Sequence, residues 1–415
     1  MKEFDIREFG AVCDGRTLNT KAIQAAIDAA AAKGCGRVLI SEGIYKTGTI
    51  CLKTGVNLHI DADAILLGSE KCEDYPERTD VKHVNSPMLP RERNACLIYA
   101  DECENIAITG MGTIDCNGES FIYRDDNVEK GLHYKRIDAP TPPRVIFLAG
   151  CKNVKITDIT MKNQPAGWSY WIHDCDFVTI DRCKIYANLE YPNNDGIHIN
   201  SSRNVTVSNC IISCSDDSLV IRANNSSLAE NKVCEKVTVT NCNLTSYSGG
   251  VRVGWKADGT IRNCSFTNLV MTDTSCGISI LLPCGGEKRI PDEGREDTKI
   301  ENLMFSHIIM DGIYSHPLFI SVGENPPARC AGISNISFSD IQARALEFPY
   351  FAGRRGCIIK NIRMTNCNFE KVSDDVLPNR KFHGCACYNY KPDIPPYRFC
   401  ENIVLENTSF TSTDQ

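Results

Sequence analysis

Three aspartates are the residues of this chain best suited to acid–base chemistry. Asp195 follows two asparagines, and Asp216 and Asp217 are adjacent. Like charges within a few ångströms raise each other's pKa, so a cluster of these carboxyls would keep one of them protonated near neutral pH. An acid beside ionised carboxylates is what hydrolysis of a glycosidic bond requires. The alternative is that each aspartate only makes a turn.

This chemistry depends on whether Asp195 and the Asp216–Asp217 pair come together. Asp195 and Asp217 each begin a copy of one strand pattern, in which the third and fifth residues are apolar, as in a half-buried strand. The copies DGIHIN, DSLVIR, GGVRVG and CGISIL start at residues 195, 217, 249 and 276, so they are 22, 32 and 27 residues apart. Such intervals are typical of one coil of a solenoid. Parallel stacking would then bring Asp195 into register with Asp217, roughly 4.8 Å away. Asp216 reaches the same face only if the polar run 213–218 bends the chain.

A second repeat extends the solenoid to most of the chain. Segments such as CKNVKITDITMKN from 151 and RNVTVSNCIIS from 203 recur to the C-terminal end. Coiled parallel strands pair every backbone edge except those at the two ends. We therefore expect an all-β fold, a right-handed parallel β-helix; a leucine-rich horseshoe lacks its leucine spacing here, and a β-propeller needs about 40 residues per blade. One aligned position predicts an interior column of small hydrophobic side chains, mostly thiols, rather than a metal cluster: Ile159, Cys183, Cys210, Cys242, Cys264 and Cys367.

The chain is interpreted as one domain with a cap at its N-terminal end. Residues 1–35 are expected to form a short strand and an amphipathic helix, which begins at Asn19 or Thr20, runs through about Lys33 and ends at Gly34. Residues 36–415 are expected to form one continuous β-helix. A solenoid needs its open end covered, so the helix is interpreted as a cap.

Composition and charge exclude several classes of partner and location. The net charge is −7 and no cluster of lysine or arginine stands out, so neither nucleic acid nor a membrane is expected as a partner. The N-terminal residues lack a signal-peptide pattern, and no run of about 18 apolar residues occurs. We therefore expect a cytoplasmic protein. The 23 cysteines are interpreted as reduced thiols. The oligomeric state stays open.

These motifs resemble those of the family 28 glycoside hydrolases, the polygalacturonases and rhamnogalacturonases. Residues 193–196 are similar to the family's asparagine-any-aspartate-glycine motif, residues 215–217 to its paired-aspartate motif, and PAGWSYWIHDC at 165–175 to its proline-x-tryptophan…histidine segment. The resemblance covers most of the chain, from EFGAVCDG onward. It implies that Asp216 is the general acid and that Asp195 and Asp217 hold and deprotonate the attacking water, with inversion at the anomeric centre.

Three positions depart from the family pattern. Ser248 stands in place of the histidine of a glycine-histidine-glycine motif, and His198 in place of an aspartate that closes the first motif. The family's arginine-isoleucine-lysine, a pair that contacts the substrate carboxylate, is replaced by residues 279–281, SIL. The repeat places Arg252 one rung below Ser279. We hypothesise that Arg252, with Arg222 beside it, binds a sugar carboxylate through paired N–H donors of its guanidinium. The alternative is that Arg252 packs over Trp255 or pairs with a surface acid.

The expected ligand is an oligosaccharide, and neither a cofactor nor a metal is expected. Trp168 and His173 are cleft candidates by resemblance, and Arg144 is either a cleft arginine or a residue that packs at the rim. The candidate substrate-binding residues are Asn193, His198, Arg222, Ser248, Arg252, Trp168, His173 and Arg144.

The leading hypothesis is an exo-acting inverting hydrolase of pectin-derived or other uronic-acid oligosaccharides. Residues 70–93 and 282–298 are the segments that could close one end of its cleft. A neutral-sugar glycosidase, a β-helix lyase or epimerase, with calcium on the three acids, and a carbohydrate-binding solenoid without activity are the alternatives. His383, Cys385 and Cys387 are interpreted as part of a lid loop rather than as metal ligands.

Overall fold

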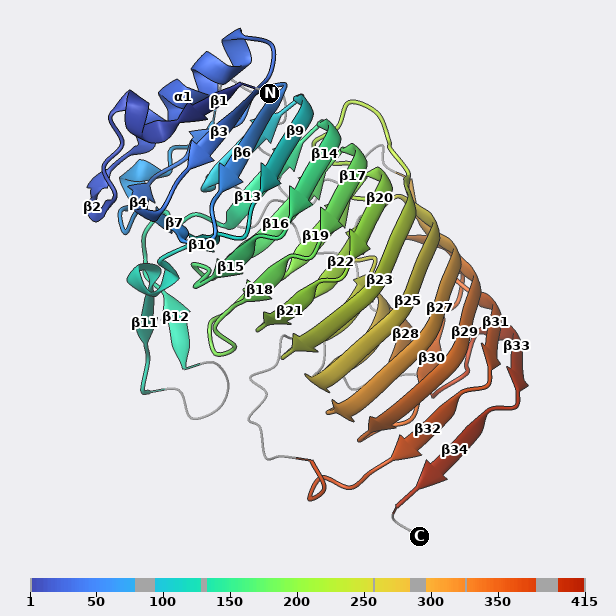
Figure 1. Cartoon of the computed structure of the whole chain (residues 1–415). Helices are drawn as coiled ribbons and strands as arrows, with labels where there is room; N and C mark the ends of the chain where they lie inside the picture. The colour runs from blue at the N-terminus through green and yellow to red at the C-terminus, as the bar shows by residue number, and fades with distance from the viewer. Residues whose placement is uncertain are drawn as a thin grey trace.

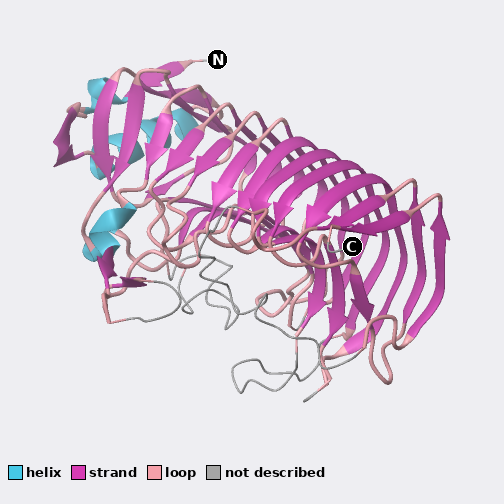
Figure 2. Ribbon diagram, turned by 90° about the horizontal axis from the view of Figure 1, so that it is seen from below, coloured by secondary structure: helices cyan, strands magenta, loops and turns pink. Residues whose placement is uncertain are grey.

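The computed structural model describes residues 2–78, 94–127, 133–256, 258–283, 296–324, 327–377 and 395–413. Parallel strands stack along one axis from the N-terminal to the C-terminal end (Figures 1 and 2). The predicted parallel β-helix is confirmed. Segments 79–93 and 284–295, which belong to the two expected cleft-closing segments, and the group His383, Cys385 and Cys387 lie outside the described residues.

One face of the coil is a ten-stranded parallel sheet, and each of its strands is called a rung below. Its inner side chains are apolar because they line the interior, and its outer side chains form the surface on which the three aspartates lie. In spatial order its strands are β5 (Ile50–Cys51), β8 (Ile98–Asp101), β13 (Arg144–Ala149), β16 (Trp168–His173), β19 (Ile197–Asn200), β22 (Leu219–Arg222), β24 (Gly249–Val253), β26 (Cys276–Leu282), β28 (Leu318–Val322) and β30 (Tyr350–Ala352).

The other two faces belong to one 22-stranded sheet, because its four longest strands run unbroken around the bend between them. These four are β23 (Cys234–Ser246), β25 (Thr260–Thr274), β27 (Thr298–Ile313) and β29 (Cys330–Ala345). The strands on the first face are β1 (Glu3–Asp5), β3 (Gly36–Ile40), β6 (Val56–Ile60), β9 (Glu104–Thr109), β14 (Lys152–Thr157), β17 (Asp176–Asp181), β20 (Arg203–Ser208), β31 (Ile359–Thr365) and β33 (Cys400–Glu406). Those on the second are β2 (Asp14–Leu18), β4 (Gly43–Thr47), β7 (Ala64–Gly68), β10 (Thr113–Asp115), β15 (Thr160–Lys162), β18 (Lys184–Tyr186), β21 (Ile211–Cys214), β32 (Asn368–Lys371) and β34 (Ser409–Ser412).

Asparagines mark the bends between the faces. Asn263, Asn302 and Asn335 all have φ between 54 and 58°, a left-handed conformation that asparagine tolerates better than most residues. Their side chains also bond along the axis: the Asn302 Nδ2 donates to Asn263 Oδ1 at 3.2 Å, and the Asn335 Nδ2 to Asn302 Oδ1 at 3.1 Å. The repeated asparagines of the sequence therefore turn each coil at the same point.

The interior contains stacked columns of like side chains. Phe266 and Phe305 stack with ring centroids 4.7 Å apart, and Phe305 and Phe338 at 5.2 Å. The predicted thiol column is wrong at Cys264, which pairs in register with Val237, whereas Cys242 pairs with Leu269. The predicted column takes the residue six positions after the start of each repeat, and Cys264 lies six positions after Asp258. The bend residue that starts the repeat in this coil is instead Asn263, so the sequence alignment was out of phase there.

The N-terminal helix α1 (Thr20–Ala32) covers the first coil, as predicted (Figure 1). Its buried residues are Ile23, Ala26, Ile27 and Ala30, which form the apolar stripe of an amphipathic helix. Asn19 occupies the N-cap position but does not cap the helix through its side chain, which bonds instead to the main chain of Val12. Strand β1 pairs with β3, so residues 1–35 share the sheet of the β-helix. Among the described residues, no helix combines the length and the apolar character needed to cross a membrane.

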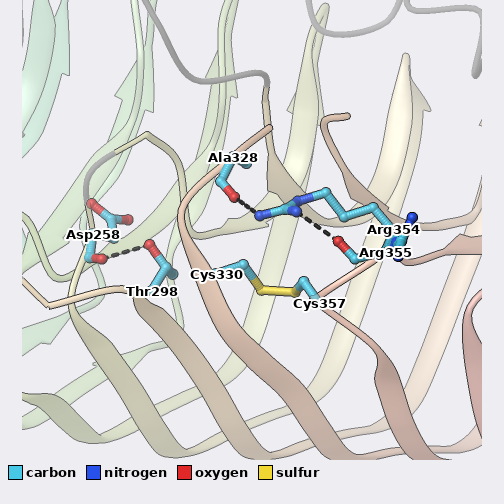
Figure 3. The surroundings of a disulfide bond; sticks show 7 residues. All are labelled: Asp258, Thr298, Ala328, Cys330, Arg354, Arg355 and Cys357. Atoms are coloured by element: carbon cyan, nitrogen blue, oxygen red, sulfur yellow. Dashed lines mark hydrogen bonds between the residues drawn. A yellow bond between two sulfur atoms is a disulfide. The ribbon is translucent and has the colours of Figure 1, made fainter. Parts of the chain in front are cut away.

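Two cysteines form a disulfide, contrary to the expectation that all are thiols. Cys330 begins β29, Cys357 precedes β31, and the bond joins these neighbouring coils (Figure 3). Close by, the Arg354 guanidinium donates to the carbonyl oxygen of Ala328. The other 18 described cysteines are free, and 13 of them are buried, as expected for small hydrophobic side chains.

The register of the four repeat copies agrees with the sequence alignment. Ile197 pairs with Leu219, Leu219 with Val251, and Val251 with Ile278. Arg252 pairs with Ser279, which is the predicted one-rung offset. Because the alignment holds through all four rungs, the starts of the first two copies lie beside each other.

Candidate active site

One column of outward-facing side chains runs the length of the ten-stranded sheet and is called the floor column. It is aromatic toward both ends and more polar in the middle, where His198, Arg252 and Ser279 lie. From the N-terminal side its members in register are Cys51, Tyr99, Phe147, Trp171, His198, Val220, Arg252, Ser279, Phe319 and Tyr350. The change in character marks the middle rungs as the place for polar chemistry.

The three aspartates gather at the start of these middle rungs. One oxygen each of Asp195, Asp216 and Asp217 lies within 4.8 Å of the other two, and all three residues are buried. Gly196 permits this approach: its N–H donates to the Asp217 carbonyl at 2.9 Å, and a Cβ would lie 2.2 Å from the Ser218 carbonyl oxygen. The glycine of the first motif is therefore needed for close packing of the two rungs.

A bend between β21 and β22 lets adjacent aspartates point to the same cluster. Strand β21 ends at Cys214, bends follow at Ser215 and Asp216, and β22 begins at Leu219. The bend predicted from the polar run 213–218 is present. Without it, neighbouring residues of a strand would point to opposite faces.

Asp216 is held by its own backbone turn and by Asn193. Its Oδ1 accepts from the Asp217 N–H at 3.0 Å, and its Oδ2 accepts from Asn193 Nδ2 at 3.2 Å. The Asn193 Oδ1 accepts in turn from Arg136 Nη1 at 3.0 Å. Arg136 ends β12 (Tyr134–Arg136), which forms a two-stranded ribbon with β11 (Ile122–Arg124). The ribbon thus orients the first motif through Asn193.

Asp217 is fully buried between a hydroxyl and a cation. The Ser248 Oγ donates to its Oδ1 at 2.9 Å, and Arg252 Nη1 lies 2.5 Å from its Oδ2. Burial raises the pKa of Asp217 to about 6; Arg252 and Ser248 act against this rise, and the nearby charge of Asp216 adds to it. Asp217 therefore ionises close to neutral pH, as a group that exchanges protons in catalysis must.

His198 bonds to the third aspartate. Its Nε2 lies 2.9 Å from Asp195 Oδ2, and its ring stacks on Trp168 with centroids 3.9 Å apart and an interplanar angle of 11°. The ring is fully buried. Burial, together with the positive charges of nearby arginines, holds the pKa of His198 well below its usual value, so the imidazole is neutral.

The two arginines of the cation hypothesis lie in adjacent rungs but have different partners. Arg252 pairs with Asp217 and lies over the Trp255 ring, 4.5 Å from its centroid. Arg222 pairs with buried Asp258, with 2.7 Å between Nε and Oδ2. Of these two arginines, Arg252 is the one that pairs with the aspartate cluster. Binding of a sugar carboxylate by Arg252 stays a prediction.

Three other candidates lie toward the N-terminal side of the cluster. Arg144 is fully buried, its guanidinium within 4.8 to 5.6 Å of three aromatic ring centroids, and burial lowers its pKa to about 9. His173 is buried and bonded to Asn200 and Ser227, and lies two residues beyond the Trp171–His198 pair along the rung. Trp168 is partly exposed and contacts His198. Of these three, Trp168 is the one placed beside the acid cluster.

The position of the family's second cation is occupied by an apolar residue. Leu281 packs in an outer apolar cluster with partly buried Trp255. The other members of this cluster are Cys276, Phe319, Tyr350 and Ala352. Ser279 itself is buried in the floor column.

Sequence reasoning missed the supports of the cluster. Arg136 and Asp258 were not singled out, although each makes a bond that decides where a candidate residue points. Neither residue belongs to the repeat, because Arg136 lies in the β11–β12 ribbon and Asp258 in the connection between β24 and β25. The only available hint was the charge of the two residues.

Chemically, the cluster can both donate and accept a proton. Like charges this close together disfavour full ionisation of the cluster, while Arg252 pairs with Asp217. Carboxylate oxygens at this spacing are also ligands of the kind that Ca²⁺ takes. The ion pair with Arg252 already supplies a positive charge at Asp217.

The sequence matches the family model described as glycosyl hydrolases family 28 over residues 90–347, more than half of the chain. The matched region contains all three aspartates, Arg252 and the floor column from Tyr99 to Phe319.

Among curated relatives, an exo-poly-alpha-D-galacturonosidase of Dickeya chrysanthemi is 28% identical over 255 residues, which cover 52% of this chain and 41% of that protein. An exopolygalacturonase of Zea mays is 23% identical over 392 residues, which cover 86% of this chain and 89% of that protein. The chain thus spans less than half the length of the Dickeya relative.

Among solved structures, that of a hyperthermoactive exopolygalacturonase from Thermotoga maritima superposes with a TM-score of 0.70 at 20% identity. The match covers 89% of this chain and 87% of that chain. At this identity the likeness shows the fold, which agrees with the parallel β-helix described above.

Proposed function

The chain belongs to family 28 of the glycosyl hydrolases, and on that premise we propose that it hydrolyses O-glycosidic bonds in galacturonan or related uronic-acid oligosaccharides, with inversion. The observation that carries the proposal is the cluster of three buried carboxyls at the start of two adjacent rungs. It places a proton donor beside proton acceptors on the outer face of the sheet.

The partners of each carboxyl support a division of roles. Arg252 and Ser248 both favour the ionised form of Asp217. Asp216 is proposed as the general acid because it occupies the first aspartate of the family's paired-aspartate motif. Asp195 and Asp217 are left ionised and able to accept a proton from water.

The reaction then consumes one water for each bond broken. Asp216 transfers its proton to the glycosidic oxygen as that oxygen leaves the anomeric carbon. The water, held by Asp195 and Asp217, attacks the anomeric carbon from the opposite face and gives a proton to one of these carboxylates. Exchange with solvent returns the proton to Asp216.

The spacing of the carboxyls makes the stereochemistry a sharp test. Inverting enzymes usually separate acid and base by roughly 6.5–9.5 Å, and retaining enzymes by about 5–5.5 Å. Here the closest oxygens lie within 4.8 Å. Inversion is proposed because two carboxylates share the water instead of one facing it across the sugar, and family membership supports this. Proton NMR of the first-formed anomer decides between inversion and retention.

Exo-action on short oligosaccharides is proposed from the relatives, two of which carry exo-activity in their names. A uronic acid is the proposed sugar, because Arg252, which pairs with Asp217 in the acid cluster, would bind its carboxylate. A neutral sugar is the second candidate substrate, because Arg252 already pairs with Asp217 and Leu281 lies in an apolar cluster.

A panel of galacturonic-acid oligosaccharides and neutral aryl glycosides tests the proposal. We expect release of saturated monosaccharide from the uronic-acid substrates, and loss of about 10³-fold or more in kcat for Asp216→Asn. Asp311→Asn is the matched control, because Asp311 is an exposed residue that pairs with Arg344 on another face of the coil; its activity should equal that of the native protein.

Other products contradict the proposal in different ways. An unsaturated, ultraviolet-absorbing product would indicate a lyase, and sugar binding without turnover a carbohydrate-binding solenoid. Equal activity of Asp216→Asn and the native protein would remove Asp216 from the reaction.

A further inference from the structure

His198 lies in the middle of the floor column, between the aromatic N-terminal part and the acid cluster. Its register neighbours are Trp171 on one side and Val220 on the other. The ring is fully buried and lies flat against Trp168, whose own side chain is partly exposed. A sugar in the cleft would therefore meet Trp168 first, which argues against His198 as a direct substrate contact.

The bond to Asp195 settles which nitrogen of His198 carries the proton. An ionised carboxylate only accepts, so the 2.9 Å contact requires an N–H at Nε2. The Nδ1 atom is buried and makes no hydrogen bond to the described part of the chain. Burial, with the charges of Arg252, Arg222 and Arg144, keeps the pKa of the ring low. His198 is thus a neutral imidazole that donates its Nε2–H to Asp195.

The main chain of Asp195 is fixed independently of its side chain. Its carbonyl oxygen accepts from the Ser169 N–H at 2.9 Å and from the Ser169 Oγ at 2.7 Å. The backbone of Asp195 is thus anchored to β16, and His198 Nε2 holds the Oδ2 atom of its side chain.

We propose that His198 is a positioning residue for the reaction: its Nε2–H orients the Asp195 carboxylate toward the attacking water and favours its ionised form, while Trp168 fixes the plane of the imidazole. The proposal rests on the proposed hydrolysis. It differs from the expectation that His198 binds substrate, since the ring acts on a catalytic carboxylate and not on the sugar.

Two substitutions distinguish the role of the His198 N–H donor from that of its aromatic ring. His198→Phe keeps an aromatic ring against Trp168 but lacks the donor. His198→Gln loses the ring but places an amide N–H close to the position of Nε2. A role in packing alone predicts that His198→Phe behaves like the native protein, whereas the positioning role predicts that His198→Gln does.

For His198→Phe we expect kcat to fall about 10–100-fold with KM changed less than about threefold, because the lost bond acts on the reacting carboxylate. The acidic limb of kcat/KM should also move to higher pH, since a donor to the ionised form lowers the pKa of Asp195. Among the described residues, Asp216 and Asp217 lie within 4.8 Å of Asp195, and the charges of Arg252, Arg222 and Arg144 act on His198; neither variant alters these groups. His198→Gln should stay within about fivefold of the native kcat.

A second readout does not need turnover. In protein labelled at histidine nitrogens, NMR should show His198 as the neutral Nε2–H tautomer that does not titrate between about pH 5 and 8. Asp195→Asn should shift its Nε2 resonance. A titrating His198, the Nδ1–H tautomer, or native kcat and pH limb in His198→Phe would overturn the inference. Native protein that cleaves no glycoside, yet shows the predicted tautomer, would instead reject the proposed function.

Discussion

Arg252 and Asp217 come from successive rungs of the ten-stranded sheet and form a buried ion pair, with 2.5 Å between Nη1 and Oδ2. The pair joins an arginine of the floor column to a carboxylate of the aspartate cluster. The next arginine back along the chain, Arg222, is equally buried but pairs with Asp258. The two arginines therefore form a natural matched pair for mutagenesis.

Replacing Arg252 by glutamine should move the acidic limb of the activity profile. Burial raises the pKa of Asp217 to about 6, and Arg252 opposes that rise. Without the guanidinium the pKa of Asp217 rises further, so Asp217 is protonated at pH values at which it is ionised in the native protein. We expect the native limb near pH 6, a limb at higher pH in Arg252→Gln, and at least about a tenfold loss of kcat/KM on the acid side.

The same variant distinguishes two roles of Arg252. If Arg252 only stabilises Asp217, kcat/KM should fall equally for uronic-acid and neutral substrates. If Arg252 binds the sugar carboxylate, kcat/KM should fall much more for uronic-acid substrates. Arg222→Gln is the control and should leave the pH limb in place. If the acidic limb of the activity profile stays at the same pH in Arg252→Gln, the group that titrates there is not Asp217.

Ser248→Ala should weaken catalysis without unfolding the protein. The hydroxyl donates to Asp217 Oδ1 at 2.9 Å, and a hydrogen bond to a charged group contributes about 1.5 kcal/mol, roughly tenfold in kcat/KM. Steady-state kinetics on the preferred substrate measure this loss. Ser306→Ala is the control, because the Ser306 hydroxyl donates to Thr267 on another face; similar losses in both variants would count against a specific role for Ser248.

Asp258→Asn should lower the free energy of unfolding more than it alters the chemistry. Asp258 is buried, pairs with Arg222, and its main-chain oxygen accepts from the Thr298 hydroxyl (Figure 3). Removing one partner leaves the Arg222 charge buried, at a cost of about 3–5 kcal/mol. Denaturant unfolding measures this change. A stable variant whose pH limb has moved would show that Asp258 acts on the acid cluster instead.

The double substitution Cys330→Ser/Cys357→Ser should destabilise the C-terminal coils. The disulfide closes a separation of 27 residues, and the loop-entropy model assigns about 3–4 kcal/mol to such a closure. Reductant should lower the free energy of unfolding of the native protein by the same amount as the double substitution does. It should not change the free energy of unfolding of the variant.

Peptide mapping of the unreduced protein from cells is the direct check of this bond. Free, alkylated Cys330 and Cys357 would contradict the disulfide. The result also bears on the predicted cytoplasmic location, because disulfides persist mainly in oxidising compartments.

The coil and its register could be predicted from the sequence because they depend on local spacing. Alternating apolar residues such as Ile197 and Ile199 define the inner face of a rung, and coil-length intervals align one rung with the next. Hence the meeting of Asp195 with Asp217, the offset of Arg252 from Ser279 and the buried stripe of the cap helix were all accessible.

Only the tertiary structure decided which partner each polar side chain meets. Arg252 bonds to Asp217 but Arg222 to Asp258, and His198 bonds to Asp195 although His173 in the preceding rung bonds to Asn200 and Ser227. Such choices depend on side-chain rotamers and on irregular connections between rungs, whose length and path follow no period. A repeat places residues on a face of the coil, whereas the packing of that face determines which charges are buried and paired, and therefore which groups can exchange a proton.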